Sequence, residues 1–460
     1  MASTNSKTLP LPPGNFGLPV IGESISFFKD SEFTEKRYKK YGSVFKTNLF
    51  GNPTIIMIGS EANRFLFTND NKYFSNQWPS STRILLGSAS VAVQRGGIHQ
   101  KRRKILSQAF QPRALAEYTS RMEEILQNYC DKWEKTDTLT WYPEIRKYTF
   151  DVACKLLVGT DSASDTELLE LFEEWIAGLF TLPIRLPWTR FSKALRCRKL
   201  LLDKIEKIVL QRQQQPVSNK DALGILLQAT DDDGNRLDLE EIKDQVLTLL
   251  FAGHETLTSA LASMCLFLAQ HPEDRSKITN SFAQHPEVFK KVREEQKQLG
   301  LSQPLNSDNL KQMTYLDQVI KEVLRFSPPV GGGFREVIES CEFNGYLIPK
   351  GWTVSYAVPK THQDNNIYTE PLNFDPERFA PSRAEDKSKP FANIPFAGGM
   401  RECIGKEFAK LEMKLFTALL VREYDWQLLS DENLNNDGTS IITLKDKFKV
   451  KFNKIGSREH

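Results

Sequence analysis

The ten residues 396–405, near the end of the chain, constrain the fold more than any other stretch. They include three glycines, one aromatic residue, one arginine and one cysteine. Apolar residues then recur at steps of three and four, which predicts that a helix begins directly after the stretch. Cys403 therefore lies where a glycine-rich loop enters a helix N-terminus. Glycines let backbone N–H groups approach the sulfur, and with the helix dipole these groups are expected to lower the pKa of the thiol.

A cysteine in such a loop has several possible uses. A zinc site needs further Cys or His ligands at short spacing, and none lies near Cys403. A nucleophilic cysteine needs a histidine base, which the sequence does not exclude. Free cysteine is also commonly just a small buried residue. The cysteine by itself does not decide between nucleophile, iron ligand and packing residue.

The whole stretch is more specific than its cysteine. Phe396, Gly399, Arg401, Cys403 and Gly405 match the haem-binding loop F-x-x-G-x-R-x-C-x-G, and the chain resembles the cytochrome P450 superfamily. The resemblance implies that Cys403 is the proximal thiolate ligand of a b-type haem. The implied fold is mainly α with a small β-rich lobe around the haem. We expect residues 1–15 to be a tail with a proline-rich segment and residues 16–460 to be one catalytic domain.

Two further segments match the family's contacts to the haem propionates. His99 and Arg103 lie one turn apart on a predicted helix, and taken alone they would be surface charges. The family carries W-x-x-x-R on this helix, so His99 takes the Trp place and keeps a ring N–H. Arg335 follows a run of three glycines and aligns with the family's second propionate arginine, beside Arg401. The implied cofactor-binding set is His99, Arg103, Arg335, Phe396, Gly398, Arg401 and Gly405.

The longest predicted helix, residues 238–270, starts at a capping-box pattern. Apolar residues on nearly every side of residues 246–253 predict complete burial there. Glu255 and Thr256 follow at once, and a buried acid is costly unless it has a partner or a task. The run Ala-Gly-His-Glu-Thr that ends at Thr256 matches the family's signature on the distal side of the haem. The resemblance implies that these two residues relay protons.

A Glu-x-x-Arg pair closes another predicted helix, residues 317–326. An isolated Glu-x-x-Arg motif usually forms an exposed ion pair that contributes under about 1 kcal/mol to stability. With Pro-Glu-Arg-Phe further on, it resembles the family's buried network of Glu322, Arg325 and Arg378. The implied role of this network is structural.

Two irregular segments are candidates for the substrate pocket. Residues 69–93 and 178–188 contain aromatic and aliphatic residues that loops seldom carry, and the second segment suits a lid over an entrance. Ordinary packing under a loop explains them equally well. Arg83 or Arg185 could orient a substrate carboxylate, although a solvated arginine is the simpler interpretation. The expected pocket residues are Trp78, Phe180, Leu182, Ala252, Val330 and Gly332.

Three local predictions complete the chain. The strand-like runs 342–348 and 352–358 are expected to pair with each other, and a final hairpin is expected over residues 441–452. The glycines 331–333 are expected to let a strand pass close to a ligand. Ala-Gln-His-Pro-Glu occurs at residues 269–273 and again at 283–287, which we interpret as a surface duplication.

Composition and chain length bound the partners. A net charge of +3 gives no reason to expect nucleic acid, and no apolar run is long enough to span a bilayer. Six scattered cysteines indicate a reducing compartment. We therefore expect a soluble, cytoplasmic monomer without a membrane anchor. The chain is expected to leave no room after Cys403 for a fused reductase. The resemblance to the family's soluble members then implies electrons from NAD(P)H through a ferredoxin and its reductase or a flavodoxin-type donor.

The function implied by the resemblance is a haem-thiolate monooxygenase that inserts one oxygen atom of O2 into a C–H bond. His99, the segment around Glu255 and residues 328–335 look most like the retinoic-acid hydroxylases, including their soluble cyanobacterial members. Retinoic acid or a related terpenoid acid is the expected substrate, with a fatty acid, sterol or other terpenoid as alternatives. Hydroperoxide-rearranging or peroxygenase chemistry and a non-catalytic haem sensor are the other classes to weigh.

Overall fold

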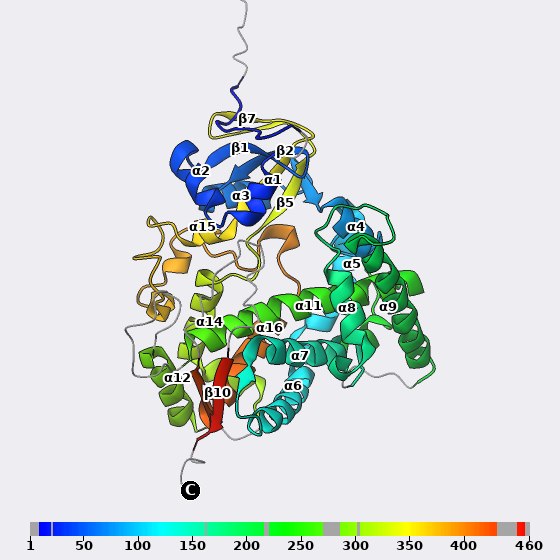
Figure 1. The fold of residues 1–460 in the computed structure, drawn as a ribbon, viewed down its shortest axis with the longest axis vertical. Helices are drawn as coiled ribbons and strands as arrows, with labels where there is room; N and C mark the ends of the chain where they lie inside the picture. Colours follow the sequence, from blue (N-terminus) through cyan, green and yellow to red (C-terminus); the bar gives the residue numbers. More distant parts are fainter. Residues whose placement is uncertain are drawn as a thin grey trace, which may run out of the picture.

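The structure is a computed structural model that describes residues 9–19, 22–161, 163–215, 220–269, 286–300, 304–429 and 449–455. Helices make up most of it, and a β-rich lobe lies at one end (Figure 1). This is the mainly α architecture with a small β lobe expected from the sequence. Within the described residues, no helix is both long enough and apolar enough to cross a membrane.

The β-rich lobe contains a five-stranded sheet of order β1-β2-β8-β5-β3. β1 (Val44–Leu49) and β2 (Asn52–Met57) form the hairpin predicted from their alternating pattern. β8 (Thr353–Ala357) runs parallel to β2 and antiparallel to β5 (Gly332–Val337), and β5 pairs with β3 (Phe74–Gln77). The helices of this lobe are α1 (Ser24–Lys29), α2 (Phe33–Tyr41), α3 (Ser60–Thr68) and α15 (Val358–His362).

The expected pairing of residues 342–348 with 352–358 is wrong. The first run folds on itself as β6 (Cys341–Phe343) and β7 (Tyr346–Ile348). Asn344 and Gly345 connect them with φ of 51° and 78°, the positive values that a tight two-residue hairpin turn requires. The second run, as β8, instead joins β2 and β5 in the large sheet.

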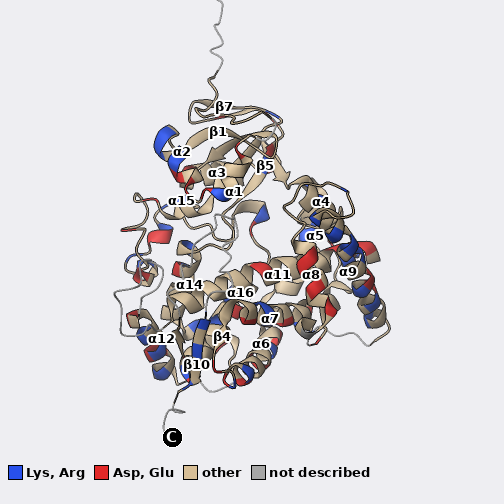
Figure 2. Ribbon diagram, viewed as in Figure 1, with Lys and Arg blue, Asp and Glu red and all other residues tan. Residues whose placement is uncertain are grey.

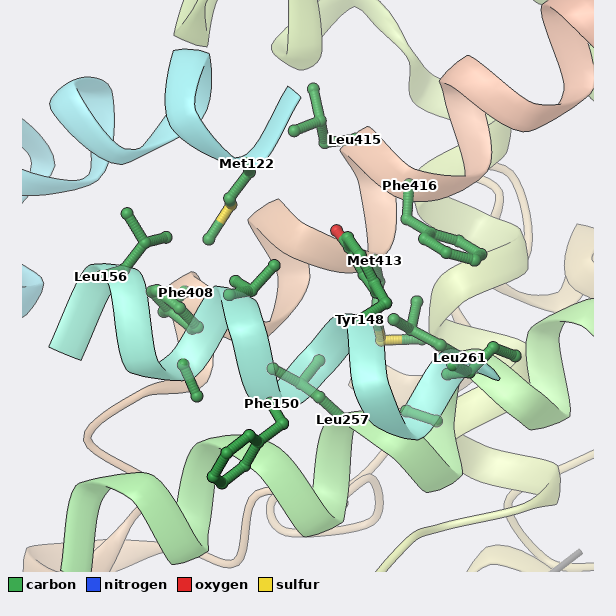
Figure 3. Close-up of a cluster of buried hydrophobic side chains, with 14 of the residues drawn as sticks. Met122, Tyr148, Phe150, Leu156, Leu257, Leu261, Phe408, Met413, Leu415 and Phe416 are labelled. Atoms are coloured by element: carbon green, nitrogen blue, oxygen red, sulfur yellow. The ribbon is translucent and has the colours of Figure 1, made fainter. Parts of the chain in front are cut away.

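The helical body is organised around α11 (Leu239–Phe267), which starts at the predicted capping box of Asp238 and Glu241. α7 (Trp141–Ala153) packs along α11, and Figure 3 shows their apolar side chains meeting those of α16 (Lys406–Glu423). The remaining helices of the body are α5 (Gly96–Ser107), α6 (Pro112–Trp133), α8 (Glu167–Ile176), α9 (Arg190–Gln213), α10 (Ala222–Leu226), α12 (Pro286–Leu299), α13 (Ser307–Gln312) and α14 (Thr314–Phe326).

Two segments flank this body. Residues 69–93, expected to be irregular, contain β3 and the helix α4 (Ser80–Leu86), so that expectation is only partly right. Residues 178–188 do form an irregular connection, between α8 and α9. Acidic residues on α8 lie beside a helix α9 that is rich in basic residues (Figure 2), and Lys204 Nζ lies 3.1 Å from Glu167 Oε2.

A small three-stranded sheet of β4 (Leu139–Thr140), β10 (Lys449–Lys454) and β9 (Tyr424–Leu428) packs beside the body. β10 is the last part of the hairpin expected over residues 441–452, and the rest of that hairpin lies outside the described residues. Most of the duplicated Ala-Gln-His-Pro-Glu segment lies outside them as well.

Candidate active site

The loop before α16 folds back on itself and lies directly against α3. The Cys403 N–H donates to the Phe396 carbonyl over 3.0 Å, which closes the loop. Gly399 has φ of +68°, and a Cβ there would lie 2.4 Å from the Phe67 carbonyl oxygen. A Cβ on Gly398 would lie 2.8 Å from the Phe67 ring. Both glycines are therefore required by the contact with α3.

Cys403 lies just before the first turn of α16, as the sequence predicts. Cys403 keeps some accessible surface on a loop that is partly exposed, while protein atoms crowd the thiol on its other sides. The Gly405 N–H is directed at the sulfur, and Arg103 adds positive charge. Burial nevertheless outweighs both effects and raises the pKa of the Cys403 thiol. The expected lowering of this pKa is therefore wrong for the protein alone, because sequence does not reveal the desolvation.

Three arginines from different elements converge beside this loop. Arg103 of α5 donates from Nη2 to the Glu402 carbonyl over 2.6 Å, and Arg401 donates from Nη2 to the Gln94 carbonyl over 2.7 Å. Arg335 of β5 is buried, and its Nε has no hydrogen-bond partner among the described residues. The structure thus brings together three of the four polar side chains expected at the propionates.

The fourth, His99, is buried in the same cluster. Its pKa falls to about 4, first because of burial and then because of the positive charges of Arg401, Arg103 and Arg335. Burial also lowers the pKa of Arg401 to about 10, with the neighbouring arginines adding to the effect. His99 is therefore neutral at pH 7, and the cluster carries an excess of positive charge.

Asp70, which follows α3, is an acid with a buried side chain beside this cluster. Its side chain is 4% exposed, and its two oxygens lie 3.7 Å from Arg335 Nε and 3.9 Å from Arg401 Nε. Neither distance closes a hydrogen bond. Among the described residues, Asp70 is the one carboxylate within 4 Å of the guanidinium groups of the three arginines. One negative charge therefore faces three positive charges.

This donor set fits a haem. Two positive charges remain after Asp70 is counted, which suits a group with two carboxylates, and the unpaired Arg335 Nε supplies a donor for one of them. Among the described residues, no three His, Cys, Asp or Glu side chains gather as a metal site. A metal on Cys403 would therefore take its other ligands from a cofactor, as haem iron does.

The distal helix α11 presents different residues to its two sides. In the middle of the helix Ala252 is exposed, and Phe251, Gly253 and Thr256 are half-buried, while most other residues after the first turn are buried. The Thr256 hydroxyl donates to the Ala252 carbonyl over 2.7 Å. His254 and Glu255 are buried. The expectation of complete burial for residues 246–253 therefore holds as far as Leu250 and is wrong for Phe251, Ala252 and Gly253. Glu255 is buried as expected, and Thr256 is only half-buried.

Glu255 has a partner that sequence reasoning did not find. Arg146 of α7 donates from Nη2 to Glu255 Oε1 over 2.8 Å and from Nε to Glu173 Oε1 of α8 over 2.8 Å. Burial raises the pKa of Glu255 even though Arg146 acts in the opposite direction. The acid is thus anchored to α7, and through Arg146 to α8.

The structural network expected at the end of α14 is present. Glu322 accepts from Arg325 Nε over 2.6 Å and from Arg378 Nε over 3.2 Å, and all three side chains are fully buried. Arg325 also donates from Nη1 to the His362 carbonyl over 2.8 Å. These contacts tie α14 to the segment that leads into the Cys403 loop.

The expected pocket residues are distributed over several elements. The rings of Trp78 and Phe180 lie 6.5 Å apart, so the two irregular segments meet. Val330 is 38% exposed and precedes β5, and Ala252 is exposed on α11. Leu182 is 73% exposed and faces solvent.

The glycine run before Arg335 lies against β8, and its expected closeness to a ligand stays a prediction. A Cβ on Gly332 would lie 2.1 Å from the Tyr356 carbonyl oxygen, and one on Gly333 would lie 2.7 Å from the Tyr356 hydroxyl. The contact with β8 therefore already requires a residue without a Cβ at both positions.

Asp70 and Arg146 leave little signal in the sequence. Asp70 belongs to a polar turn, and its closeness to Arg335 and Arg401 arises only when β5 and the cysteine loop meet. Arg146 leaves a weak signal, since it lies one turn before Thr149 and Phe150 on the otherwise apolar face of α7.

Comparison with known proteins identifies the class. The family model described as "Cytochrome P450" matches residues 12–452, and the chain belongs to this family. It is 51% identical to cytochrome P450 120 of Synechocystis sp. over 98% of this chain and 99% of that protein. It is 37% identical to cytochrome P450 26A1 of Gallus gallus over 96% of this chain and 90% of that protein.

A solved structure agrees with these relatives. "Retinoic acid bound cyanobacterial CYP120A1" superposes with a TM-score of 0.91 at 50% identity, covering 98% of this chain and 100% of that one. The expected fold and class are thereby confirmed: the protein is a haem-thiolate monooxygenase. It uses haem b, O2 and electrons derived from NAD(P)H through redox partners.

Proposed function

We propose that this P450 hydroxylates retinoic acid or a closely related terpenoid acid. The observation that carries the proposal is the similarity, at 50% identity over 98% of the chain, to a cyanobacterial P450 with retinoic acid bound. The expected pocket residues support an apolar ligand, because Trp78, Phe180 and Val330 contribute mainly hydrocarbon surface. A fatty acid or sterol would use the same chemistry and differs only in how well it fits.

Each side chain of the site has a proposed task. Cys403 would hold the iron, while His99, Arg103, Arg335 and Arg401 would bind the propionates. Phe396, Gly398 and Gly405 would shape the loop around the haem. Haem bound there activates O2 with two electrons and two protons, so that one oxygen atom enters a C–H bond and the other leaves as water. Thr256 would pass protons at the exposed side of α11, and Glu255 would supply them from the buried side.

Burial of the apolar chain would provide most of the affinity. Removing roughly 400 Å² of apolar surface from water at about 25 cal/mol per Å² contributes about 10 kcal/mol before the entropy of association is subtracted. Micromolar binding therefore needs no strong polar anchor. Arg83 and Arg185 are both exposed, and either could still orient a carboxylate near the entrance.

Titration with three ligands tests the substrate class. Purified enzyme is titrated with retinoic acid, retinol and a saturated fatty acid while the spin state of the iron is followed. The proposal predicts a saturating shift with retinoic acid and a weaker or absent shift with the fatty acid. A clear shift with the fatty acid and none with either retinoid would overturn the retinoid assignment and leave the hydroxylase class unaffected.

We further propose a cytoplasmic monomer that receives electrons from a ferredoxin and its reductase, or from a flavodoxin-type donor. Lys406 and Lys410 follow Cys403 and would lie on the docking face. Lys406 Nζ lies 2.8 Å from Glu402, and Lys410 Nζ lies 3.2 Å from Glu407. These acids offset part of the positive charge, which favours modest affinity. Reduction rates measured with each donor over a range of ionic strength would test the assignment.

A further inference from the structure

His254 is fully buried between α11, α7 and α8, and the activity described above gives it no task. Its ring lies 5.3 Å from the Phe150 ring and 5.8 Å from the Phe172 ring, centroid to centroid. Phe150 points from α7 toward α11 in Figure 3. Burial, with a contribution from Arg146, holds the pKa of His254 well below its ordinary value of 6.5. The imidazole is therefore neutral and carries one N–H.

The two ring nitrogens of His254 have different surroundings. Nδ1 lies 2.9 Å from the Thr149 hydroxyl, and that hydroxyl lies 2.7 Å from the Thr258 hydroxyl. Nε2 has no hydrogen-bond partner among the described residues, and it lies 3.5 Å from Glu255 Oε1. A small rotation of either side chain would complete a hydrogen bond between them.

The neighbours of the ring determine which nitrogen carries the proton. A bare Nε2 lone pair would face an anionic oxygen and repel it, whereas Nε2–H would attract it. The Thr149 hydroxyl can donate to Nδ1, and the Thr258 hydroxyl can donate either to Thr149 or to the His254 carbonyl 2.9 Å away, so the hydroxyl groups are compatible with the Nε2–H tautomer and the contact with Glu255 selects it. The structure therefore favours a proton on Nε2.

Both contacts to Glu255 converge on the same oxygen. Arg146 Nη2 lies 2.8 Å from Oε1, and His254 Nε2 lies 3.5 Å from the same atom. Neither contact uses Oε2. We propose that His254 is a positioning residue for Glu255: together with Arg146 it holds Oε1, so that Oε2 is the atom that takes up and releases protons. The inference rests on the relay role proposed above for Glu255.

The test compares variants under two oxygen sources. With O2, NADPH and redox proteins, one substrate C–H bond, two electrons and two protons give one hydroxyl and one water. With hydrogen peroxide in place of O2, the electrons and protons arrive together with the oxygen, and the relay is bypassed. A positioning defect lowers product per NADPH and leaves the peroxide-driven yield unchanged, whereas general damage to the fold lowers both.

His254→Phe retains an aromatic ring of similar size but has no N–H. We expect its product per NADPH, measured with retinoic acid, to fall roughly two- to tenfold, the effect of losing one hydrogen bond of ordinary strength, because the 3.5 Å contact is long for a charge-assisted bond. His254→Gln can donate to the same oxygen and should recover most of the loss. Ser263→Ala is the matched control, since it removes a buried hydrogen bond to Ser327 (3.0 Å) from the same helix away from Glu255.

Two outcomes would overturn the proposal. One is a product per NADPH in His254→Phe equal to that of the wild type while the product per NADPH of Glu255→Gln falls. This result would leave the relay role of Glu255 standing. The other is an Nδ1–H tautomer in the 15N spectrum of the diamagnetic, reduced carbon monoxide complex, with His254 assigned through the His254→Phe variant. Unchanged coupling in Glu255→Gln would instead refute the relay role itself.

Discussion

The Glu322 network allows a quantitative prediction about stability. Glu322 accepts from Arg325 Nε and Nη2 at 2.6 and 2.8 Å, from Arg378 Nε at 3.2 Å and from the Asp375 N–H at 2.8 Å. Glu322→Ala would leave Arg325 buried with backbone carbonyls as partners, while Arg378 would keep Glu385 at 2.8 Å. Removing one partner of a buried ion pair typically costs about 3–5 kcal/mol.

That cost is a large part of the roughly 5–15 kcal/mol that stabilises a typical folded protein. It corresponds to a roughly hundred- to several-thousand-fold shift toward the unfolded state. Urea unfolding followed by circular dichroism should show the midpoint of Glu322→Ala far below that of the wild type, with much of the protein insoluble on expression.

Glu377→Gln is the matched control for this prediction. Glu377 is adjacent to Arg378, but its ion pair with Lys291, at 2.9 Å, is exposed, so its loss should cost under about 1 kcal/mol. Equal midpoints for Glu322→Ala and Glu377→Gln would refute the reasoning.

Three further predictions concern other parts of the molecule. Arg335→Met removes a buried hydrogen-bond donor that forms no hydrogen-bonded ion pair with Asp70, and it should weaken haem binding roughly 10- to 150-fold, measured as faster transfer of haem to apomyoglobin. Asp70→Asn removes the anion that competes with haem for Arg335 and should slow that transfer. Thr256→Ala should keep consuming NADPH and O2 while product falls and peroxide accumulates, and unchanged product per NADPH would contradict its relay role. Burial lowers the pKa of His362 to about 3, so between about pH 6.5 and 3 the unfolded chain binds a proton that the folded protein does not. The free energy of unfolding should therefore decrease as the pH is lowered through that window, by up to about 4–5 kcal/mol from this group. The free energy of unfolding of His362→Gln should depend less on pH by that amount, and parallel pH profiles of the two proteins would contradict the prediction.

The parts of the site that could be predicted from the sequence are those whose residues lie close together in the chain and form short motifs. The cysteine loop, the start of α11 and the Glu-x-x-Arg pair each require particular residues at fixed spacing, so a local reading was sufficient. The hairpin of β1 and β2 follows equally directly from alternation interrupted by a turn.

The parts that sequence missed depend on contacts between distant segments. Asp70 meets Arg335 and Arg401 only when three separate elements assemble, and Arg146 reaches Glu255 only because α7 packs along α11. The direction of the Cys403 pKa was wrong for the same reason, since burial is a property of the whole fold. The pairing of residues 342–348 was wrong because the turn at Asn344 and Gly345 was not recognised.

The direct test of the central claim is the absorption spectrum of the reduced, carbon-monoxide-bound protein. If Cys403 is the axial thiolate ligand, the wild type shows the red-shifted Soret band of thiolate ligation and Cys403→Ser does not. The Cys341→Ser variant, which changes a half-buried cysteine on β6, should keep the band. A Cys403→Ser protein that retained the band would contradict the account.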